Sequence, residues 1–160
     1  MNKKILKILA DDARCPVADI AVMTGMTEGE VADELKELEK AGLIRGYKAV
    51  IDWEKLDNAY VSALIELKVI PQEEYGFERI AETVMKYKEV ESVYLMSGSY
   101  DLCVIVKGKT FQEVAMFVAK ELATMHEVTS TATHFVLRRY KELDVELVGD
   151  EQDDRGAYSL

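Results

Sequence analysis

The chain has 160 residues, 49% of them hydrophobic, and its 30 acidic residues outnumber 20 basic ones to give a formal net charge of −10. This length and apolar content indicate a globular protein of one domain or two small ones, and the negative charge excludes indiscriminate binding of polyanions. No apolar run approaches the ~20 residues of a membrane span, and lysines interrupt the first apolar residues, so we expect neither a membrane segment nor a signal peptide.

The two cysteines, Cys15 and Cys103, lie far apart in the sequence and match no metal-binding or redox spacing. Thiols of this kind are typical of a reducing compartment. We therefore expect a cytoplasmic protein with reduced cysteines and no metal site.

Three helices are predicted in the first part of the chain. Apolar residues at helical spacing mark residues 3–10 and 17–23, and a tight turn containing Gly25 joins the second helix to the third. The third helix follows a capping box from Thr27 to Glu30 and buries a stripe formed by Val31, Leu35 and Leu38. Residues 43–51 then predict a strand. Residues 1–50 are thus expected to form a winged helix-turn-helix domain.

Residues 51–59 predict a linker with a short helical turn, and residues 60–141 a second domain. This second domain alternates strand, helix, strand, strand, helix and strand, which is the ferredoxin-like βαββαβ order of an α+β fold. An alternating, partly apolar sheet face remains outside the predicted helix layer, so we expect dimerisation through that face. Residues 142–160 are expected to form a C-terminal extension that ends in an acidic tail from Gly149 onward. The segment of residues 138–148 predicts either an extension of the last strand or a short helix, and its periodicity leaves both open.

A polar loop, Ser97-Gly98-Ser99-Tyr100-Asp101, separates the two central strands of the second domain. One interpretation is an Asx-type turn in which the Asp101 carboxylate satisfies only neighbouring backbone groups. The other is a site for a small zwitterion, with its ammonium on Asp101 and its carboxylate on backbone N–H groups. The five residues alone leave both interpretations open.

Residues 3–141 together resemble the Lrp/AsnC (feast/famine) family of transcription regulators. The match rests on the helix-turn-helix scaffold around Thr27 and Val31, on Gly42-Leu43-Ile44, and on Gly98-Ser99-Tyr100-Asp101, which matches the Gly-x-Tyr-Asp loop of the family. The threonine-rich last strand matches too. The resemblance implies a homodimer or higher oligomer that binds double-stranded DNA and a small-molecule effector, which we expect to be an amino acid.

Site residues follow from the resemblance by position. In the family the third helix enters the DNA major groove, which implies contacts by Thr27, Glu28, Asp33, Glu34, Lys36, Glu37 and Lys40. Effectors bind beside the Gly-x-Tyr-Asp loop, which implies Ser97, Gly98, Ser99, Tyr100 and Asp101, with Thr131 and Thr133 on the last strand.

The exposed positions of the third helix are acidic, whereas family members usually carry Arg or Lys around Asp33, Glu34 and Glu37. DNA affinity comes largely from cations that neutralise phosphates, so this face opposes binding. An alternative function is therefore an effector-binding oligomeric module of the same family with weak or lost DNA binding.

An enzyme is the third alternative, because the two-domain architecture also resembles the sirohaem decarboxylases, which use His and Arg around a tetrapyrrole. Only His126 and His134 are present here, and Arg138-Arg139 follows the last strand. We find no carboxylate pair, no nucleophile with a base and no metal spacing. We therefore expect a protein that is not an enzyme and has no cofactor.

Overall fold

Residues 2–56, 60–71 and 75–148 are described by a computed structural model, in which the chain divides into two units, Met1–Val50 and Ile51–Leu160. Part of the predicted linker, residues 57–59, and the predicted acidic tail from residue 149 onward lie outside the described residues. Each unit is built around its own buried core.

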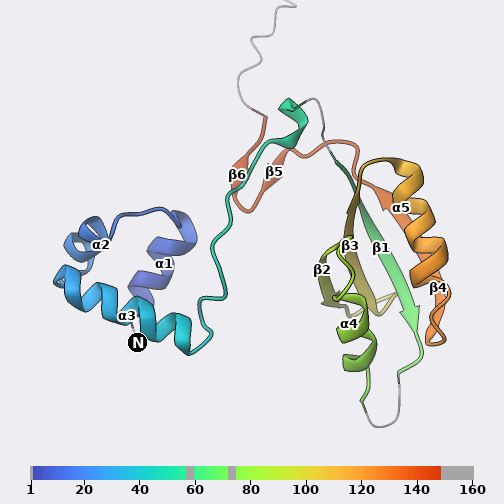
Figure 1. Ribbon diagram of the computed structural model, residues 1–160, viewed down its shortest axis with the longest axis horizontal. Helices are drawn as coiled ribbons and strands as arrows, with labels where there is room; N and C mark the ends of the chain where they lie inside the picture. The colour runs from blue at the N-terminus through green and yellow to red at the C-terminus, as the bar shows by residue number, and fades with distance from the viewer. Residues whose placement is uncertain (1, 57–59, 72–74, 149–160) are drawn as a thin grey trace, which may run out of the picture. The chain divides into compact units, whose positions relative to one another are not determined.

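The first unit contains three helices, α1 (Lys3–Asp11), α2 (Val17–Thr24) and α3 (Glu28–Lys40) (Figure 1). Each helix contributes to one small core, and its fully or nearly fully buried side chains are Ile5, Ile20, Ala21, Val31 and Leu38. Gly25 ends α2 with φ of 71°, a left-handed conformation that a glycine adopts without steric cost. The predicted helix-turn-helix is confirmed.

The start of α3 is fixed by the predicted capping box. The Thr27 hydroxyl accepts the Glu30 N–H at 3.3 Å, and Glu30 Oε2 accepts the Thr27 N–H at 2.8 Å. This hydrogen bond from the Thr27 backbone lowers the pKa of the Glu30 carboxyl. Two N–H groups that the first turn of a helix cannot pair internally are thereby satisfied.

The predicted strand at residues 43–51 is wrong for the single chain, because no strand is assigned there. The apolar side chains of this segment include Leu43, Tyr47 and Ile51, which are 49%, 49% and 44% exposed. A strand needs a neighbour for its N–H and C=O groups, and no described segment of the chain pairs with this one.

The second unit begins with a 3₁₀ turn, η1 (Trp53–Lys55), and then follows the predicted βαββαβ order. Its elements are β1 (Val61–Val69), α4 (Glu78–Val84), β2 (Val90–Leu95), β3 (Leu102–Gly108), α5 (Phe111–Phe117), a π-helical turn η2 (Val118–Leu122) and β4 (Val128–Phe135). The strands form one antiparallel sheet in the order β2-β3-β1-β4. The α+β fold predicted for this part of the chain is confirmed.

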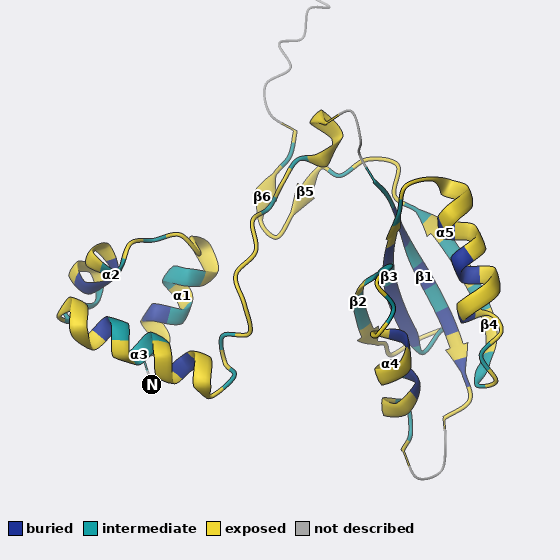
Figure 2. Cartoon of the chain, viewed as in Figure 1, coloured by how far each residue is buried: buried dark blue, intermediate teal, exposed yellow. Residues whose placement is uncertain are grey.

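One face of the sheet carries the core of the second unit. Ile65, Leu67 and Val104 are fully buried there, and α4 and α5 cover them with Val84 and Val114. Figure 2 shows the resulting pattern, in which β1 and β3 are largely buried while the outer faces of the helices are exposed.

The opposite face of the sheet, which we call the open face, is covered by none of the helices in the described part of the chain. Its half-buried or exposed apolar side chains include Leu64, Ile105 and Tyr94. His134 Nε2 lies 3.2 Å from Glu66 Oε1 on this face, and the two form an ion pair when the imidazole is protonated. The open face therefore combines apolar surface with a polar pair.

Beyond β4 the chain forms a short hairpin of β5 (Lys141–Glu142) and β6 (Val145–Glu146). The two residues of its turn, Leu143 and Asp144, have positive φ values of 45° and 66°. Neither a continuation of the last strand nor a helix, the two alternatives left open by the sequence, describes this segment.

Candidate functional site

The predicted effector loop connects β2 to β3 at one end of the sheet. Ser97, Gly98 and Ser99 are exposed, whereas Tyr100 and Asp101 are half-buried. Gly98 has φ of 149°, which L side chains rarely adopt, so the glycine permits this path of the loop.

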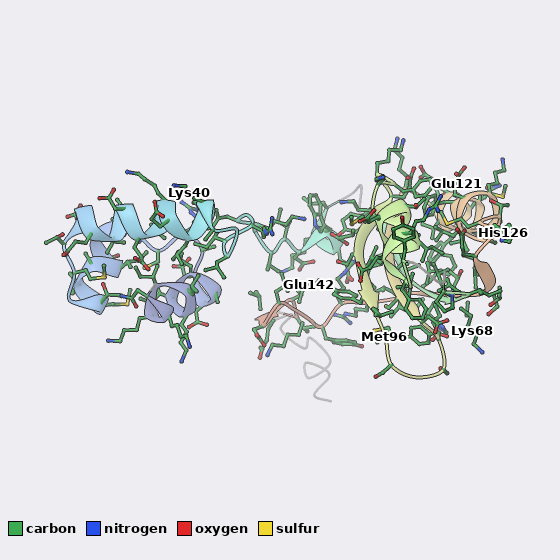
Figure 3. All side chains as sticks on the ribbon, turned by 90° about the horizontal axis from the view of Figure 1, so that it is seen from below. Lys40, Lys68, Met96, Glu121, His126 and Glu142 are labelled. Carbon is green, nitrogen blue, oxygen red and sulfur yellow. The ribbon has the colours of Figure 1, made fainter. Side chains whose placement is uncertain are left out.

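Asp101 ties the loop to the sheet through three hydrogen bonds. Its Oδ2 accepts the Val69 N–H at 2.9 Å, its N–H donates to the Leu67 carbonyl at 2.9 Å, and its carbonyl accepts the Met96 N–H at 2.8 Å. The ladder between β1 and β3 ends at the pair of Leu67 and Leu102, so the carboxylate supplies the acceptor that Val69 would otherwise lack. Met96 and Lys68, labelled in Figure 3, mark this end of the sheet.

The rest of the loop leaves polar groups available. Among the described residues, the backbone N–H groups of residues 97–100 donate no hydrogen bond, and Asp101 Oδ1 accepts none. Consecutive free N–H groups suit a carboxylate or another anion, and a free carboxylate oxygen suits an ammonium group. The loop can therefore accept a small zwitterion while Asp101 also holds the loop against the sheet.

The Tyr100 hydroxyl interacts with the thiol of Cys103, a residue whose side chain lies on the open face. Burial raises the pKa of the Tyr100 hydroxyl and of the Cys103 thiol. Both groups are thus protonated at neutral pH, and neither is an activated nucleophile.

The two predicted threonines lie on β4, which is separated from β3 by β1. Thr131 pairs with Leu67 and Thr133 with Ile65, both on the face that the helices cover. Thr131 and Asp101 therefore flank the same β1 residue, Leu67, while Thr133 lies farther along the strand. The contacts of Leu67 and Val69 with the loop had no local sequence signal, since more than 30 positions separate these residues from Asp101.

The predicted DNA-contact residues divide into two groups on α3. Thr27, Glu28, Asp33, Lys36, Glu37 and Lys40 are exposed, and Asp33 pairs with Lys36 at 3.1 Å. Glu34 is different: it is half-buried, and its Oε1 accepts the Asn2 N–H at 2.5 Å. This bond lowers the pKa of the Glu34 carboxyl. Glu34 thus has a structural role at the start of α1, which the sequence did not reveal.

Charges on the exposed side of α3 are partly engaged within the first unit. Glu39 Oε1 accepts the Tyr47 hydroxyl at 3.0 Å, and this carboxylate raises the pKa of Tyr47 in addition to the larger effect of burial. Glu37 has no ion pair among the described residues. The face around Asp33 and Glu37 consequently presents negative charge to any approaching polyanion.

No group of three or more His, Cys, Asp or Glu side chains with metal-binding geometry occurs in the described part of the chain. His126 follows η2, and His134 is the open-face partner of Glu66. None of the helices described is long and apolar enough to cross a membrane.

Comparison with known proteins matches each of the two units to a known domain family. The profile of the Lrp/AsnC ligand binding domain matches residues 62–145, and that of a winged helix-turn-helix DNA-binding domain matches residues 2–45. YugG of Bacillus subtilis, an uncharacterized HTH-type transcriptional regulator, is 45% identical over 139 residues, which cover 86% of this chain and 84% of YugG. The HTH-type transcriptional regulator FL11 of Pyrococcus horikoshii is 31% identical, over 89% of this chain and 91% of FL11.

Among solved structures, a transcriptional regulator of Neisseria meningitidis in complex with L-Met has the same fold, with a TM-score of 0.70. The two sequences are 25% identical, and the match covers 89% of this chain and 93% of the other. These similarities extend over both units in the same order. The chain therefore belongs to the Lrp/AsnC family of DNA-binding transcriptional regulators, with a helix-turn-helix unit followed by a ligand-binding domain.

Proposed function

We propose that this regulator responds to an amino acid that binds at the loop of residues 97–101. The observation that carries the proposal is the set of free backbone N–H groups at residues 97–100 beside the free Oδ1 of Asp101. The α-carboxylate of the effector accepts from the N–H groups, and its ammonium donates to Oδ1. The L-Met bound by the Neisseria relative supports this class of ligand.

Both charged ends of the ligand are needed in this arrangement. An amine without a carboxylate leaves the N–H groups of the loop unpaired, and a carboxylate without an ammonium leaves Oδ1 unpaired. In this proposal Thr131, which lies across β1 from Asp101, contributes a hydroxyl, and Thr133 lies next along the same face. Ser97 and Ser99 contribute through the backbone, so their hydroxyls are dispensable.

A thermal-shift panel of the common amino acids tests this proposal. We expect one or a few of them to raise the melting temperature, because a ligand at a hundred times its dissociation constant contributes about 2.7 kcal/mol to the folded state. The amide derivative of the same amino acid, which lacks the carboxylate, should give a much smaller shift.

Two loop variants provide the matched comparison for the panel. Gly98→Val should lose the shift, because valine does not tolerate φ of 149° and the loop must change its path. Ser99→Ala keeps every backbone donor and should retain it. If no amino acid changes the melting temperature of the wild type, the effector proposal fails.

We further propose that the open face forms a homodimer interface. Leu64, Ile105 and Tyr94 expose apolar area there, and a sheet face without helices is buried most readily against a second copy of itself.

Light scattering of the full chain at micromolar concentration should therefore give at least twice the 18.1 kDa monomer mass. Ile105→Lys should reduce the mass because it places a charge in the interface. Leu95→Lys, at a side chain that is 58% exposed on the helix-covered side of the sheet, serves as the control. A monomeric wild type would contradict the interface.

Double-stranded DNA binds, in our proposal, through the exposed side of α3, with Lys36 and Lys40 contributing the cations. Asp33 and Glu37 weaken this contact through repulsion of phosphate. The double variant Asp33→Asn with Glu37→Gln should tighten non-specific binding by about tenfold at low salt and steepen its dependence on salt concentration. Glu34 is left unchanged, because its carboxylate accepts the Asn2 N–H.

Fluorescence anisotropy of a labelled duplex, measured over a salt series, provides the affinity and the slope. The control is Glu142→Gln with Glu146→Gln, which removes the same charge from exposed positions of the hairpin. Unchanged affinity and slope in the α3 variant would mean that this helix does not approach the duplex. That result would favour the second candidate function, an effector-binding module without DNA affinity, which the acidic face of α3 suggests.

A further inference from the structure

One hollow in the ligand-binding domain is lined by residues that do not belong to the 97–101 loop. It has a volume of about 390 Å³ and is lined by Trp53, Tyr60, Lys88, Lys107, Lys109 and Glu113, among others. We call it the Trp53 pocket. Its volume is within the range of small-molecule sites.

Aromatic rings form one wall of the Trp53 pocket. The Trp53 and Tyr60 ring centroids are 5.6 Å apart with an interplanar angle of 59°, and Trp53 is 37% exposed. A tryptophan is usually well buried, because its large apolar surface favours contact with protein or ligand over water. The exposed indole therefore offers surface on which a flat group can stack.

Lysines form the rim. Lys107 Nζ lies 5.7 Å from the centroid of the Tyr60 ring, and Lys109 has no ion pair in the described part of the chain. A neighbouring hollow of about 600 Å³ shares Lys88, Glu89 and Glu113 with the Trp53 pocket and adds Lys86 and Lys120. Five of the fourteen lysines of a chain with a net charge of −10 thus line these two hollows, which together we call the groove.

Two carboxylates also line the Trp53 pocket, and each has one oxygen engaged. Glu113 Oε2 accepts the Lys109 N–H at 2.6 Å ahead of α5, and Glu89 Oε1 lies 3.8 Å from Lys88 Nζ. The lining lysines Lys88, Lys107 and Lys109 outnumber these two carboxylates. The pocket therefore favours a ligand whose net charge is negative.

We propose that the Trp53 pocket binds a small planar organic anion, an aromatic carboxylate or phosphate ester, at a site separate from the amino-acid loop. Its ring stacks on Trp53, and its anionic group lies between Lys88 and Lys109. Trp53 follows the end of the first unit by three positions, so the ligand orders the first residues of the second unit against its sheet.

Trp53 is the only tryptophan of the chain, so its fluorescence reports directly on this pocket. The full chain is titrated with phenylacetate, phenyl phosphate, cyclohexylacetate and benzyl alcohol, with excitation at the red edge of the tryptophan band. We expect saturable changes with phenylacetate and phenyl phosphate, and the tighter of the two identifies the anionic group. Cyclohexylacetate, which lacks the flat ring, and benzyl alcohol, which lacks the charge, should bind at least about tenfold more weakly, a difference of about 1.4 kcal/mol.

The charge contribution is tested with Lys88→Gln and Lys109→Gln together, which should weaken binding by about tenfold or more. The control, Lys40→Gln with Lys68→Gln, removes the same charge from exposed lysines outside the groove and should leave the dissociation constant unchanged. Gly98→Val should also keep the response, because it alters only the amino-acid loop.

Three results would overturn the proposal. These are no saturable response to either anion, equal affinity for benzyl alcohol or cyclohexylacetate, and an unchanged dissociation constant in the Lys88 and Lys109 variant. Loss of the response in Gly98→Val would instead show that the fluorescence reports on the amino-acid loop, which also contradicts a separate site.

Discussion

Leu67→Ala is expected to lower the free energy of unfolding of the second unit by about 2–5 kcal/mol, the usual cost of a leucine-to-alanine change in a packed core. Leu67 is fully buried in the middle of the core that β1 shares with α4 and α5. Alanine leaves a cavity there that the surrounding strands and helices fill only in part.

Denaturant unfolding followed by Trp53 fluorescence measures this change, because the single tryptophan belongs to the second unit. Leu95→Ala removes the same atoms from a side chain on β2 that is 58% exposed, and its unfolding midpoint should move only slightly. Equal losses in the two variants would contradict the central position of Leu67.

Asp101→Ala should also destabilise the second unit, by about 1.5–3 kcal/mol, because it removes a charged acceptor and leaves the nearly buried Val69 N–H without a partner. Asp101→Asn keeps an oxygen that can accept from Val69 and should cost about 1 kcal/mol less than alanine. Asparagine nevertheless removes the charge that the proposed effector requires.

The two variants therefore separate the structural role of Asp101 from its proposed role in binding. Thermal melting without ligand should rank wild type above Asn and Asn above Ala, whereas both variants should lose the melting shift that the effector gives. An Asp101→Asn protein that keeps the full shift would show that Asp101 does not bind the ammonium group. Equal stability of Ala and wild type would contradict the bond to Val69.

Local sequence patterns were sufficient to predict most of the helices and strands and their order. The capping box at Thr27 and Glu30 and the alternation along β1 depend on near neighbours in the chain, and the structure contains both. The order of strands and helices then limits the topology to very few choices.

Features that depend on distant partners were not predictable in this way. The sequence predicts an exposed acid at Glu34, because nothing near it in the chain indicates that it accepts the N–H of Asn2, which is 32 positions away. The turn at Leu143 and Asp144 lacks the Asn-Gly or Gly-Gly signal by which such hairpins are recognised, so its type could not be anticipated. Residues 43–51 have the apolar spacing of a strand but no strand partner within the chain.

The loop illustrates the same limit at the candidate site. Its composition identified the polar residues, but their division of roles depends on where β3 ends relative to β1. Asp101 accepts the N–H of Val69 on β1 with one oxygen, so it does not form the self-contained turn in which the carboxylate bonds only to neighbouring backbone groups. Its other oxygen accepts no hydrogen bond among the described residues. A structural role of Asp101 is therefore compatible with the proposed role in binding.

The bond between Val69 and Asp101 also makes one amide proton a probe of the loop. β1 and β3 are the inner strands, and most of their amides exchange with solvent only when the sheet opens. The Val69 N–H lies just beyond the last pair of the β1–β3 ladder and depends instead on a side chain from the loop. Its hydrogen-exchange rate therefore measures how often the loop detaches from the sheet. A ligand that holds Asp101 in place slows the exchange of this proton, even where the rest of the sheet is unaffected.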